Sequence, residues 1–239
     1  SLHDALPIWT LHLIPNLLNG DQIDILPKTA IEAAHQLDTF IVENEKYARR
    51  FLIKIGIPTA IDDLTFLVQD KHNPKQDYLP FLMPLLEGKN IGLLSDAGCP
   101  AVADPGSKIV KIAHEMQIPI MPHVGPSSIL LALMGSGFNG QEFAFNGYLP
   151  IDRGEKNRRI KWLDKQVQQF GSTQIFIETP YRNVKLLETL IQQCPKSRLL
   201  CIATDLTLPS QKILTKTMAE WKQQLPDIHK RPTVFLIGK

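Results

Sequence analysis

Short apolar runs and longer amphipathic stretches alternate along almost the whole sequence. An apolar run of about four to eight residues between turn-forming residues predicts a buried strand, and apolar residues repeating every three or four positions predict a helix. Strands that alternate with helices favour an α/β protein with mostly parallel strands. The predicted strands are Thr10–Ile14, Thr39–Glu43, Leu64–Val68, Ile91–Ser95, Ile118–Pro122, Glu142–Phe145, Thr173–Glu178, Arg198–Ala203, Lys212–Thr215 and Thr233–Ile237.

Apolar side chains fall on one face of several predicted helices, where they are expected to pack against a sheet. The groups are Tyr47, Phe51 and Leu52, then Ile109, Ile112 and Ala113, and later Ile160, Leu163 and Val167.

Two α/β domains with a cofactor cleft between them fit this order of elements. The boundary is expected near Pro122–Gly125, because the last part of the chain predicts a hairpin, Arg198–Ala203 with Lys212–Thr215, and hairpins pair antiparallel. The predicted domains are residues 9–123, with a mostly parallel sheet, and residues 124–239, with a mixed sheet. Residues 1–8 fit no pattern that continues into the first strand, and we interpret them as a foreign or disordered leader.

Composition and charge narrow the class of protein. The sequence has 239 residues, 44% of them hydrophobic and 21% charged, with a formal net charge of +2, so contact with RNA would be local. Cys99, Cys194 and Cys201 show neither disulfide nor zinc-ligand spacing, and we expect no metal. No apolar run reaches the ~20 residues that span a bilayer, which favours a cytoplasmic protein without membrane contact.

The middle of the chain holds two strand-to-helix turns about thirty residues apart. The first runs from Ser95 to a helix start at Asp104-Pro105-Gly106, and the second is Gly125-Pro126-Ser127-Ser128. Small residues at both turns let a ligand approach the backbone, and a helix N-terminus offers unpaired N–H groups. Neither turn carries the glycine pattern of a Rossmann or phosphate-binding loop, which disfavours a pyrophosphate-bearing cofactor.

The run Ser95-Asp96-Ala97-Gly98-Cys99-Pro100, followed by Asp104-Pro105-Gly106, is the most specific motif of the chain. Gly147-Tyr148-Leu149-Pro150 and the run 178–182 support it. With these motifs the sequence resembles the tetrapyrrole methylase superfamily of S-adenosylmethionine-dependent methyltransferases. It is most similar to the branch of the ribosomal RNA small-subunit methyltransferase I family, which 2′-O-methylates a cytidine.

The resemblance implies a binding site for S-adenosylmethionine that is built from both domains. The first turn, the second turn and the end of the first strand would hold its methionine and ribose parts, and backbone of the second domain would hold its adenine. The residues so implied are Pro15, Ser95, Asp96, Ala97, Gly98, Cys99, Pro100, Val102, Gly125, Pro126, Ser127, Ser128, Ile177, Leu206 and Thr233.

A ribose hydroxyl is too weak an acid to ionise at neutral pH, so a base or a polarising group would help the transfer. The candidates are Glu43, Asp104, Glu178 and, as an electrostatic aid, Arg182, each of which could instead serve in capping or ion pairing. The acceptor-side motifs depart from the family: its Glu-Asp-Thr-Arg is Glu43-Asn44-Glu45-Lys46 here. The sequence therefore predicts the methyltransferase class and leaves the acceptor open.

A basic stretch favours RNA as the acceptor. Arg158, Arg159 and Lys161 lie beside Trp162 and follow Tyr148, and such a surface can hold phosphates and stack a base, although Asp152, Glu155 and Asp164 dilute its charge. Two alternatives remain: a methylase of a small tetrapyrrole, and a non-catalytic protein that binds S-adenosylmethionine. A homodimer is implied by the resemblance alone.

Overall fold

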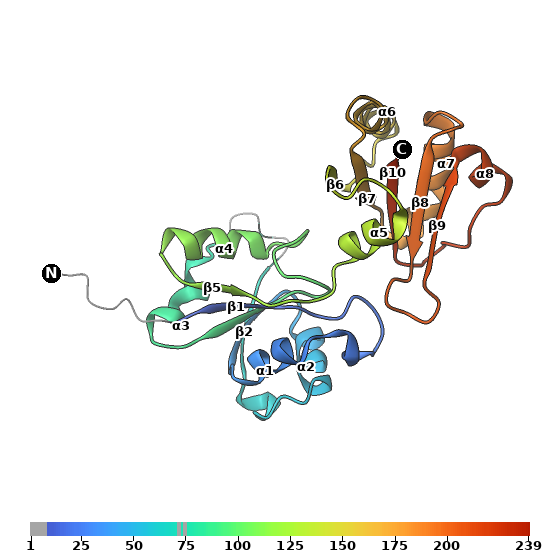
Figure 1. The fold of residues 1–239 in the computed structure, drawn as a ribbon. Helices are drawn as coiled ribbons and strands as arrows, with labels where there is room; N and C mark the ends of the chain where they lie inside the picture. The colour runs from blue at the N-terminus through green and yellow to red at the C-terminus, as the bar shows by residue number, and fades with distance from the viewer. Residues whose placement is uncertain (1–8, 71–72, 74–75) are drawn as a thin grey trace. The chain divides into compact units, whose positions relative to one another are not determined.

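The computed structural model describes residues 9–70, 73 and 76–239, so the predicted leader at residues 1–8 lies outside the described residues. The chain forms two compact units, of which the first ends at Ser127 and the second is Ser128–Lys239 (Figure 1). Each unit has a five-stranded sheet of its own, and each is described by itself below.

The sheet of the first unit is parallel throughout, with strand order β3-β2-β4-β1-β5. Each strand lies within a predicted apolar run, which confirms the α/β class and the parallel first sheet. The strands β2 and β4 are buried along their whole length, as expected where helices cover both faces of a parallel sheet. The strands are β1 (Leu11–Ile14), β2 (Thr39–Val42), β3 (Thr65–Val68), β4 (Ile91–Leu94) and β5 (Ile120–Pro122).

Helices cover the two faces of this sheet in pairs (Figure 1). One core cluster joins α1 and α2 to the sheet through residues such as Phe40 and Leu52, and another joins α3 and α4 through residues such as Ile91 and Ile109. Tyr47 is the exception to its predicted apolar face, because its side chain remains 51% exposed while Phe51 and Leu52 are buried. The helices are α1 (Lys28–His35), α2 (Glu45–Lys54), α3 (Met83–Leu86) and α4 (Gly106–Glu115), with 3-10 turns at Ile23–Ile25, Ile61–Asp63 and Leu79–Leu82.

The connections that leave β1 and β4 diverge at a single point of the sheet. The strands β1 and β4 are hydrogen-bonded neighbours. The chain continues from β1 into α1 on one face, and from β4 into α4 on the opposite face. In open parallel sheets, ligands bind outside the carboxyl ends of the strands at such a switch point.

The second unit has the mixed sheet that the sequence predicts, with strand order β6-β7-β10-β8-β9. β6 and β7 are parallel, whereas β10 pairs antiparallel with β7 and β8. The predicted hairpin is confirmed, since β8 and β9 pair antiparallel from Leu199 with Thr217 to Thr204 with Lys212. The strands are β6 (Phe143–Tyr148), β7 (Thr173–Ile177), β8 (Leu199–Thr204), β9 (Lys212–Thr217) and β10 (Thr233–Gly238).

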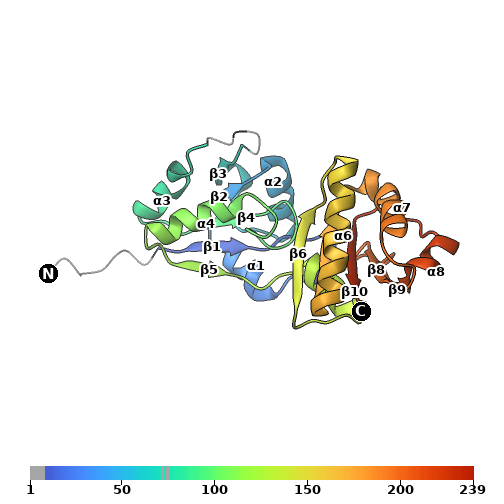
Figure 2. The ribbon, with the colours of Figure 1, turned by 90° about the horizontal axis from the view of Figure 1, so that it is seen from above.

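One helix covers one face of this sheet and three cover the other. Figure 2 shows α6 and α7 side by side, and both share a core cluster with α8. Ile160, Leu163 and Val167 of α6 are fully buried in it, as their spacing predicts. The opposite face packs against α5. The helices are α5 (Ser128–Ser136), α6 (Arg153–Phe170), α7 (Asn183–Gln193) and α8 (Met218–Gln223), with a 3-10 turn at Pro180–Arg182.

Local signals in the sequence set the ends of the longest helix. Asp152 accepts a hydrogen bond from the backbone N–H of Glu155 and so caps α6, while Gly171 ends it in the left-handed conformation with a φ of 69°. The result is an 18-residue helix whose polar face is available for a partner.

Candidate functional site

The predicted cofactor residues of the first unit gather at the carboxyl edge of its sheet. The segments that follow β1, β4 and β5 leave the sheet there, and β1 lies between β4 and β5. The structure therefore brings together Pro15, the run Ser95–Val102 and Gly125–Ser127, which are far apart in the sequence. This edge includes the switch point between β1 and β4.

Asn16 holds the loop after β4 in place, and the sequence analysis missed it. Its buried side-chain amide donates to the backbone oxygens of Ser95 at 3.0 Å and of Asp96 at 3.3 Å. Its backbone N–H donates to Gly98 O at 2.9 Å. A polar residue directly after a buried strand was the available signal, since a buried amide is normally fully hydrogen-bonded.

The same loop has an unusual backbone. Gly98, Ala101 and Ala103 all have a positive φ, at 69°, 64° and 59°. Residues other than glycine rarely adopt this region, and such conformations are concentrated at functional sites. Asp104 supports the loop, because its Oδ1 accepts hydrogen bonds at 2.8 Å from the N–H groups of Ala101 and Gly106. These contacts explain why helix α4 begins after Asp104-Pro105.

Within the loop, exposed and buried residues are intermixed. Ser95 is buried, with its hydroxyl donating to Ala97 O at 2.9 Å, and Gly98 and Pro100 are also buried. Ala97 and Val102 are exposed, and Asp96 is half-buried. The loop thus offers solvent mainly small side chains and one carboxylate.

Cys99 connects this loop to the second turn. Its thiol donates to the backbone oxygen of Pro126 at 3.4 Å, and the oxygen of Gly125 lies at 3.7 Å. Burial raises the pKa of the Cys99 thiol, so the sulfur stays protonated and acts as a donor rather than a nucleophile. Ser127 ends the first unit, and Ser128 opens α5 in the second.

Packing requires a glycine at position 125. A Cβ at this position would overlap with Cβ of Pro15, so the ends of β1 and β5 are in direct contact here. The two predicted cofactor residues form one structural unit.

A methyl group at Gly125 should therefore separate the two strand ends. We expect Gly125→Ala to lower the free energy of unfolding by about 1–3 kcal/mol through overpacking and to weaken ligand binding at this edge. Denaturant unfolding and calorimetry measure the two effects. Gly140→Ala is the control, because a Cβ there meets no atom within 4 Å. Equal stability of the two variants would contradict the packing argument.

Two histidines form a contact just before this turn. The rings of His12 on β1 and His123 after β5 are stacked, with Nδ1 of His12 3.0 Å from Nε2 of His123. Burial lowers the pKa of both, and the neighbouring His123 lowers the pKa of His12 further. Both imidazoles therefore take up a proton less readily than an exposed histidine does.

A lowered histidine pKa makes stability depend on pH. In the unfolded chain the two histidines become protonated near pH ~6.5, whereas in the folded chain they bind a proton only at lower pH. Their contribution to the free energy of unfolding is therefore fully present above about pH 6.5 and is lost as the pH falls below it. We expect His12→Gln to reduce the fall in unfolding free energy between about pH 7 and pH 5, measured by denaturant titration. A His12→Gln variant whose unfolding free energy falls as steeply with pH as that of the wild type would contradict this assignment.

The four predicted catalytic residues are divided between the units. In the first, Glu43 follows β2 at the carboxyl edge and accepts a hydrogen bond from the backbone N–H of Asp96 at 3.4 Å. Asp104 lies on the same loop but uses Oδ1 to hold the backbone. Glu43 therefore lies beside the predicted cofactor loop from a different strand.

Glu178 and Arg182 of the second unit belong to a largely buried ionic network. The Glu178 side chain is 1% exposed and accepts hydrogen bonds from Thr179 N–H at 2.8 Å. Its Oε1 lies 3.1 Å from Arg182 Nε, and its Oε2 lies 3.7 Å from Nζ of Lys156 on α6. Sequence analysis did not single out Lys156, whose only signal is a cation on the apolar face of a helix. The network holds Pro180–Arg182 against α6.

The predicted adenine-binding residues also gather at one edge. Ile177 ends β7, Leu206 follows β8, and Thr233 begins β10, which pairs antiparallel with both strands. All three residues therefore lie at the same end of the second sheet. Asp205, next to Leu206, is fixed there by two hydrogen bonds from Arg231 at 2.9 and 2.6 Å and one from Ser210 at 2.7 Å. Burial opposes ionisation of Asp205, but these donors outweigh it and lower its pKa.

The predicted substrate residues lie on the polar face of α6. Arg158 and Lys161 are exposed, and Arg159 stacks over the Trp162 ring with its guanidinium carbon 4.2 Å from the centroid. Arg159 also donates to Asn146 Oδ1 at 2.8 Å. Two of the acids expected to dilute this charge are used elsewhere: Asp152 caps the helix, and Asp164 pairs with Arg198 at 2.6 Å.

Within the described ranges, no three His, Cys, Asp or Glu side chains come together as they would around a metal ion. None of the helices that the structure describes is long and apolar enough to cross a membrane.

Comparison with known proteins places the chain in a class and a family. No protein-family model matches it. Its fold is similar to the crystal structure of the methyltransferase CobJ, with a TM-score of 0.62 over 97% of this chain and 94% of that one at 18% identity. The chain therefore shares the fold of CobJ, and the relatives in sequence show that its class is the methyltransferases.

Relatives in sequence define the family more closely. A ribosomal RNA small subunit methyltransferase I of Vibrio cholerae is 30% identical over 210 residues, which are 88% of this chain and 69% of that protein. The protein of the same name from Escherichia coli O157:H7 is 29% identical over 197 residues, 82% of this chain and 65% of its own length. The chain belongs to the ribosomal RNA small subunit methyltransferase I family and spans about two thirds of these relatives.

Proposed function

We propose that this protein transfers a methyl group from S-adenosylmethionine to the 2′ hydroxyl of a ribose in ribosomal RNA. One observation carries the proposal: the loop with the family's Ser-Asp-Ala-Gly and Asp-Pro-Gly residues leaves the sheet at its switch point. Relatives named for methylation of small-subunit ribosomal RNA support the acceptor.

The chemical groups at the carboxyl edge of the first sheet and at the Ile177 end of the second sheet fit S-adenosylmethionine. The cofactor carries a sulfonium and no phosphate, and the loops after β1, β4 and β5 contain the Asp96 carboxylate, backbone amides and small side chains but no lysine or arginine between Ser95 and Gly106. Ile177 and Leu206 provide apolar surface and backbone groups suited to adenine. We assign the methionine part to the loops of the first unit.

Bound S-adenosylmethionine supplies a methyl group on a positively charged sulfur, which is already activated for transfer. The protein mainly has to align the acceptor, and correct positioning alone can contribute ~7–11 kcal/mol to the barrier reduction. Glu43 is placed to accept the proton of the ribose hydroxyl, because it lies beside the Asp96 backbone on the cofactor loop. Arg182, 38% exposed in its side chain, can offset developing negative charge on the acceptor oxygen.

RNA would be positioned by the polar face of α6. Arg158, Arg159 and Lys161 can contact phosphates, and Trp162, which is 44% exposed, can stack a base. A homodimer in the cytoplasm completes the proposal.

Transfer of a labelled methyl group to total RNA from cells lacking this protein tests the function. We expect label in small-subunit ribosomal RNA, at a ribose that resists alkaline cleavage, without added metal. Labelling of a tetrapyrrole instead of RNA would overturn the acceptor, and tight binding of S-adenosylmethionine without turnover would overturn the enzyme. Sedimentation of the purified chain tests the dimer.

A further inference from the structure

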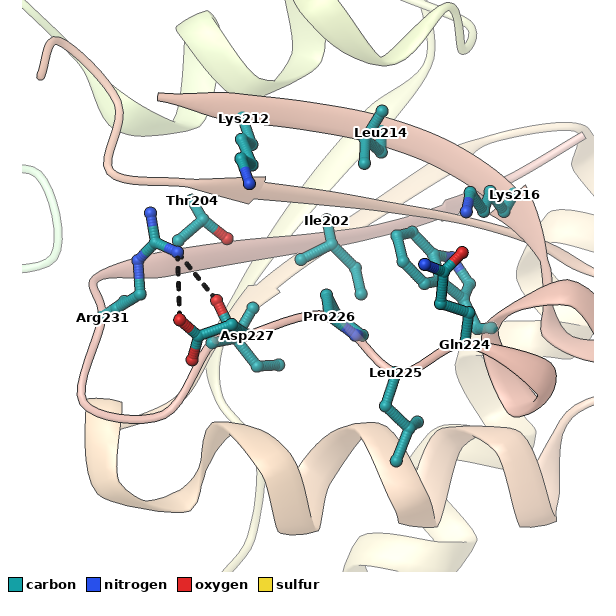
Figure 3. Close-up of a pocket in the computed structure, with 12 residues that line it drawn as sticks. Ile202, Thr204, Lys212, Leu214, Lys216, Gln224, Leu225, Pro226, Asp227 and Arg231 are labelled. Carbon is teal, nitrogen blue, oxygen red and sulfur yellow. Dashed lines mark hydrogen bonds and ion pairs between the residues drawn. The ribbon is translucent and has the colours of Figure 1, made fainter. Parts of the chain in front are cut away.

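A cavity in the second unit lies apart from every residue discussed so far as catalytic or substrate-binding. It measures about 340 Å³ and lies between the hairpin β8–β9 and the segment that joins α8 to β10 (Figure 3). This volume is within the range of small-molecule pockets, about 300–1,000 Å³. The edge strand β9 forms one wall.

The inner lining of the cavity is apolar. Ile202 and the Trp221 ring are almost fully buried, and Trp221 is fixed by its indole N–H, which donates to Leu200 O at 2.9 Å. Leu214 and Leu225 lie at the mouth and remain 46% and 50% exposed. Large apolar side chains on either side of a cavity provide surfaces that a flat ring could cover.

The rim is cationic. Lys212, Leu214 and Lys216 alternate along β9 and so face the same side, with Pro226 and Leu225 across the cavity (Figure 3). Among the described residues, neither lysine forms an ion pair within 4 Å, while Lys216 Nζ lies 5.1 Å from the centroid of Trp221. The Glu220 carboxylate interacts electrostatically with Lys216, so Lys212 is the charge available to an anion.

The remaining charges at the cavity offset one another. Arg231 donates to Asp205 and to the backbone oxygen of Asp227, and its Nη1 lies 3.7 Å from the Asp227 carboxylate. Thr204 and Gln224 add hydrogen-bonding groups at the wall. The cavity thus combines apolar walls, a few polar groups and the cationic Lys212 at its rim.

We propose that this cavity binds an unpaired nucleobase of the RNA, with the adjoining phosphate on Lys212. Aromatic side chains that stack bases, beside cationic side chains that hold phosphates, are the usual combination for single-stranded nucleic acid, and Trp221 and Lys212 both line this cavity. The cavity lies on the sheet face that α6, α7 and α8 cover, so it shares a layer with the basic face of α6. This inference rests on the proposed function.

Two substitutions separate the apolar and the ionic contributions of the cavity to RNA binding. In anisotropy titrations of a labelled single-stranded RNA with the full chain, we expect Leu225→Ser to weaken binding about fivefold or more with an unchanged salt slope. Lys212→Ala should flatten the slope of log affinity against log salt by about 0.7, the value for one phosphate contact on a single strand. Both positions are exposed, so the fold should persist.

Lys222→Ala is the matched control, since Lys222 is exposed on α8 and does not line the cavity. If Leu225→Ser and Lys212→Ala both bind RNA as tightly as the wild type, while changes on α6 still weaken RNA binding, this inference would be overturned and the proposed function would stand. Absence of RNA binding by the wild-type chain would overturn the proposed function. Binding of adenosine monophosphate as tight as that of the oligomer would also overturn the inference, because the ligand would then be a free nucleotide.

Discussion

Glu43→Gln should lower the rate of methyl transfer by about 10²–10⁴-fold, the usual contribution of a positioned general base. The amide keeps the size and the acceptor oxygen that receives the Asp96 N–H, but it cannot take a proton from a ribose hydroxyl. Affinity for S-adenosylmethionine should remain within a few-fold of wild type. Calorimetry and single-turnover transfer from labelled cofactor measure the two quantities separately.

Glu43 is chosen because it lies beside the Asp96 backbone on the predicted cofactor loop. Asp104 Oδ1 holds two backbone N–H groups, and the Glu178 side chain is 1% exposed and lies between Lys156 and Arg182. Glu115→Gln, at an exposed position of α4, controls for loss of a surface carboxylate. A Glu43→Gln enzyme as fast as this control would show that Glu43 does not accept the proton.

The positions of the strands could be predicted from the sequence because each apolar run is bounded by turn residues. Their order could not, since β2 pairs with β3 and β4, and β1 with β4 and β5, and the sequence carries no signal for which buried strands become neighbours. The switch point between β1 and β4 follows from this order. The local motifs therefore predicted a candidate site at these loops, but they did not indicate why the loops meet.

The reasons for individual residues were harder to predict than their positions. For Gly125 the structure adds a packing reason that the sequence did not show, because its space is limited by Pro15, a residue more than one hundred positions away. Asn16 and Lys156 were missed because a polar side chain becomes informative only when its burial is known. Tyr47 followed the apolar period of α2 but remains exposed, since an aromatic residue with a polar tip satisfies either environment.

The acidic residues of α6 also have roles that could be recognised only in the structure. In the sequence, Asp152, Glu155 and Asp164 are mixed with the basic residues and reduce the expected field. In the structure, Asp152 is committed to the helix N-terminus and Asp164 to Arg198, whose side chain is 12% exposed. On α6, Arg158 and Lys161 therefore stay exposed, while Asp164 is paired with a cation outside the helix.

Replacing Arg158, Arg159 and Lys161 together with alanine should weaken RNA binding strongly and reduce its salt dependence. If each residue contacts one phosphate, the slope of log affinity against log salt should fall by about 0.7 per residue on single-stranded RNA. Affinity for S-adenosylmethionine should not change, because these residues lie outside both cofactor edges. Anisotropy titrations over a salt series measure the slope.

A triple variant of Lys185, Lys196 and Lys222 to alanine is the matched control, since it removes the same charge from exposed positions of the same unit. Arg159 also donates to Asn146 and stacks on Trp162, so its loss can affect folding as well as RNA contact. The Arg158→Ala/Lys161→Ala double variant avoids this problem and should retain about two thirds of the slope change. Equal slopes in the double variant and the lysine control would contradict phosphate contact by α6, and would favour a small-molecule acceptor over RNA.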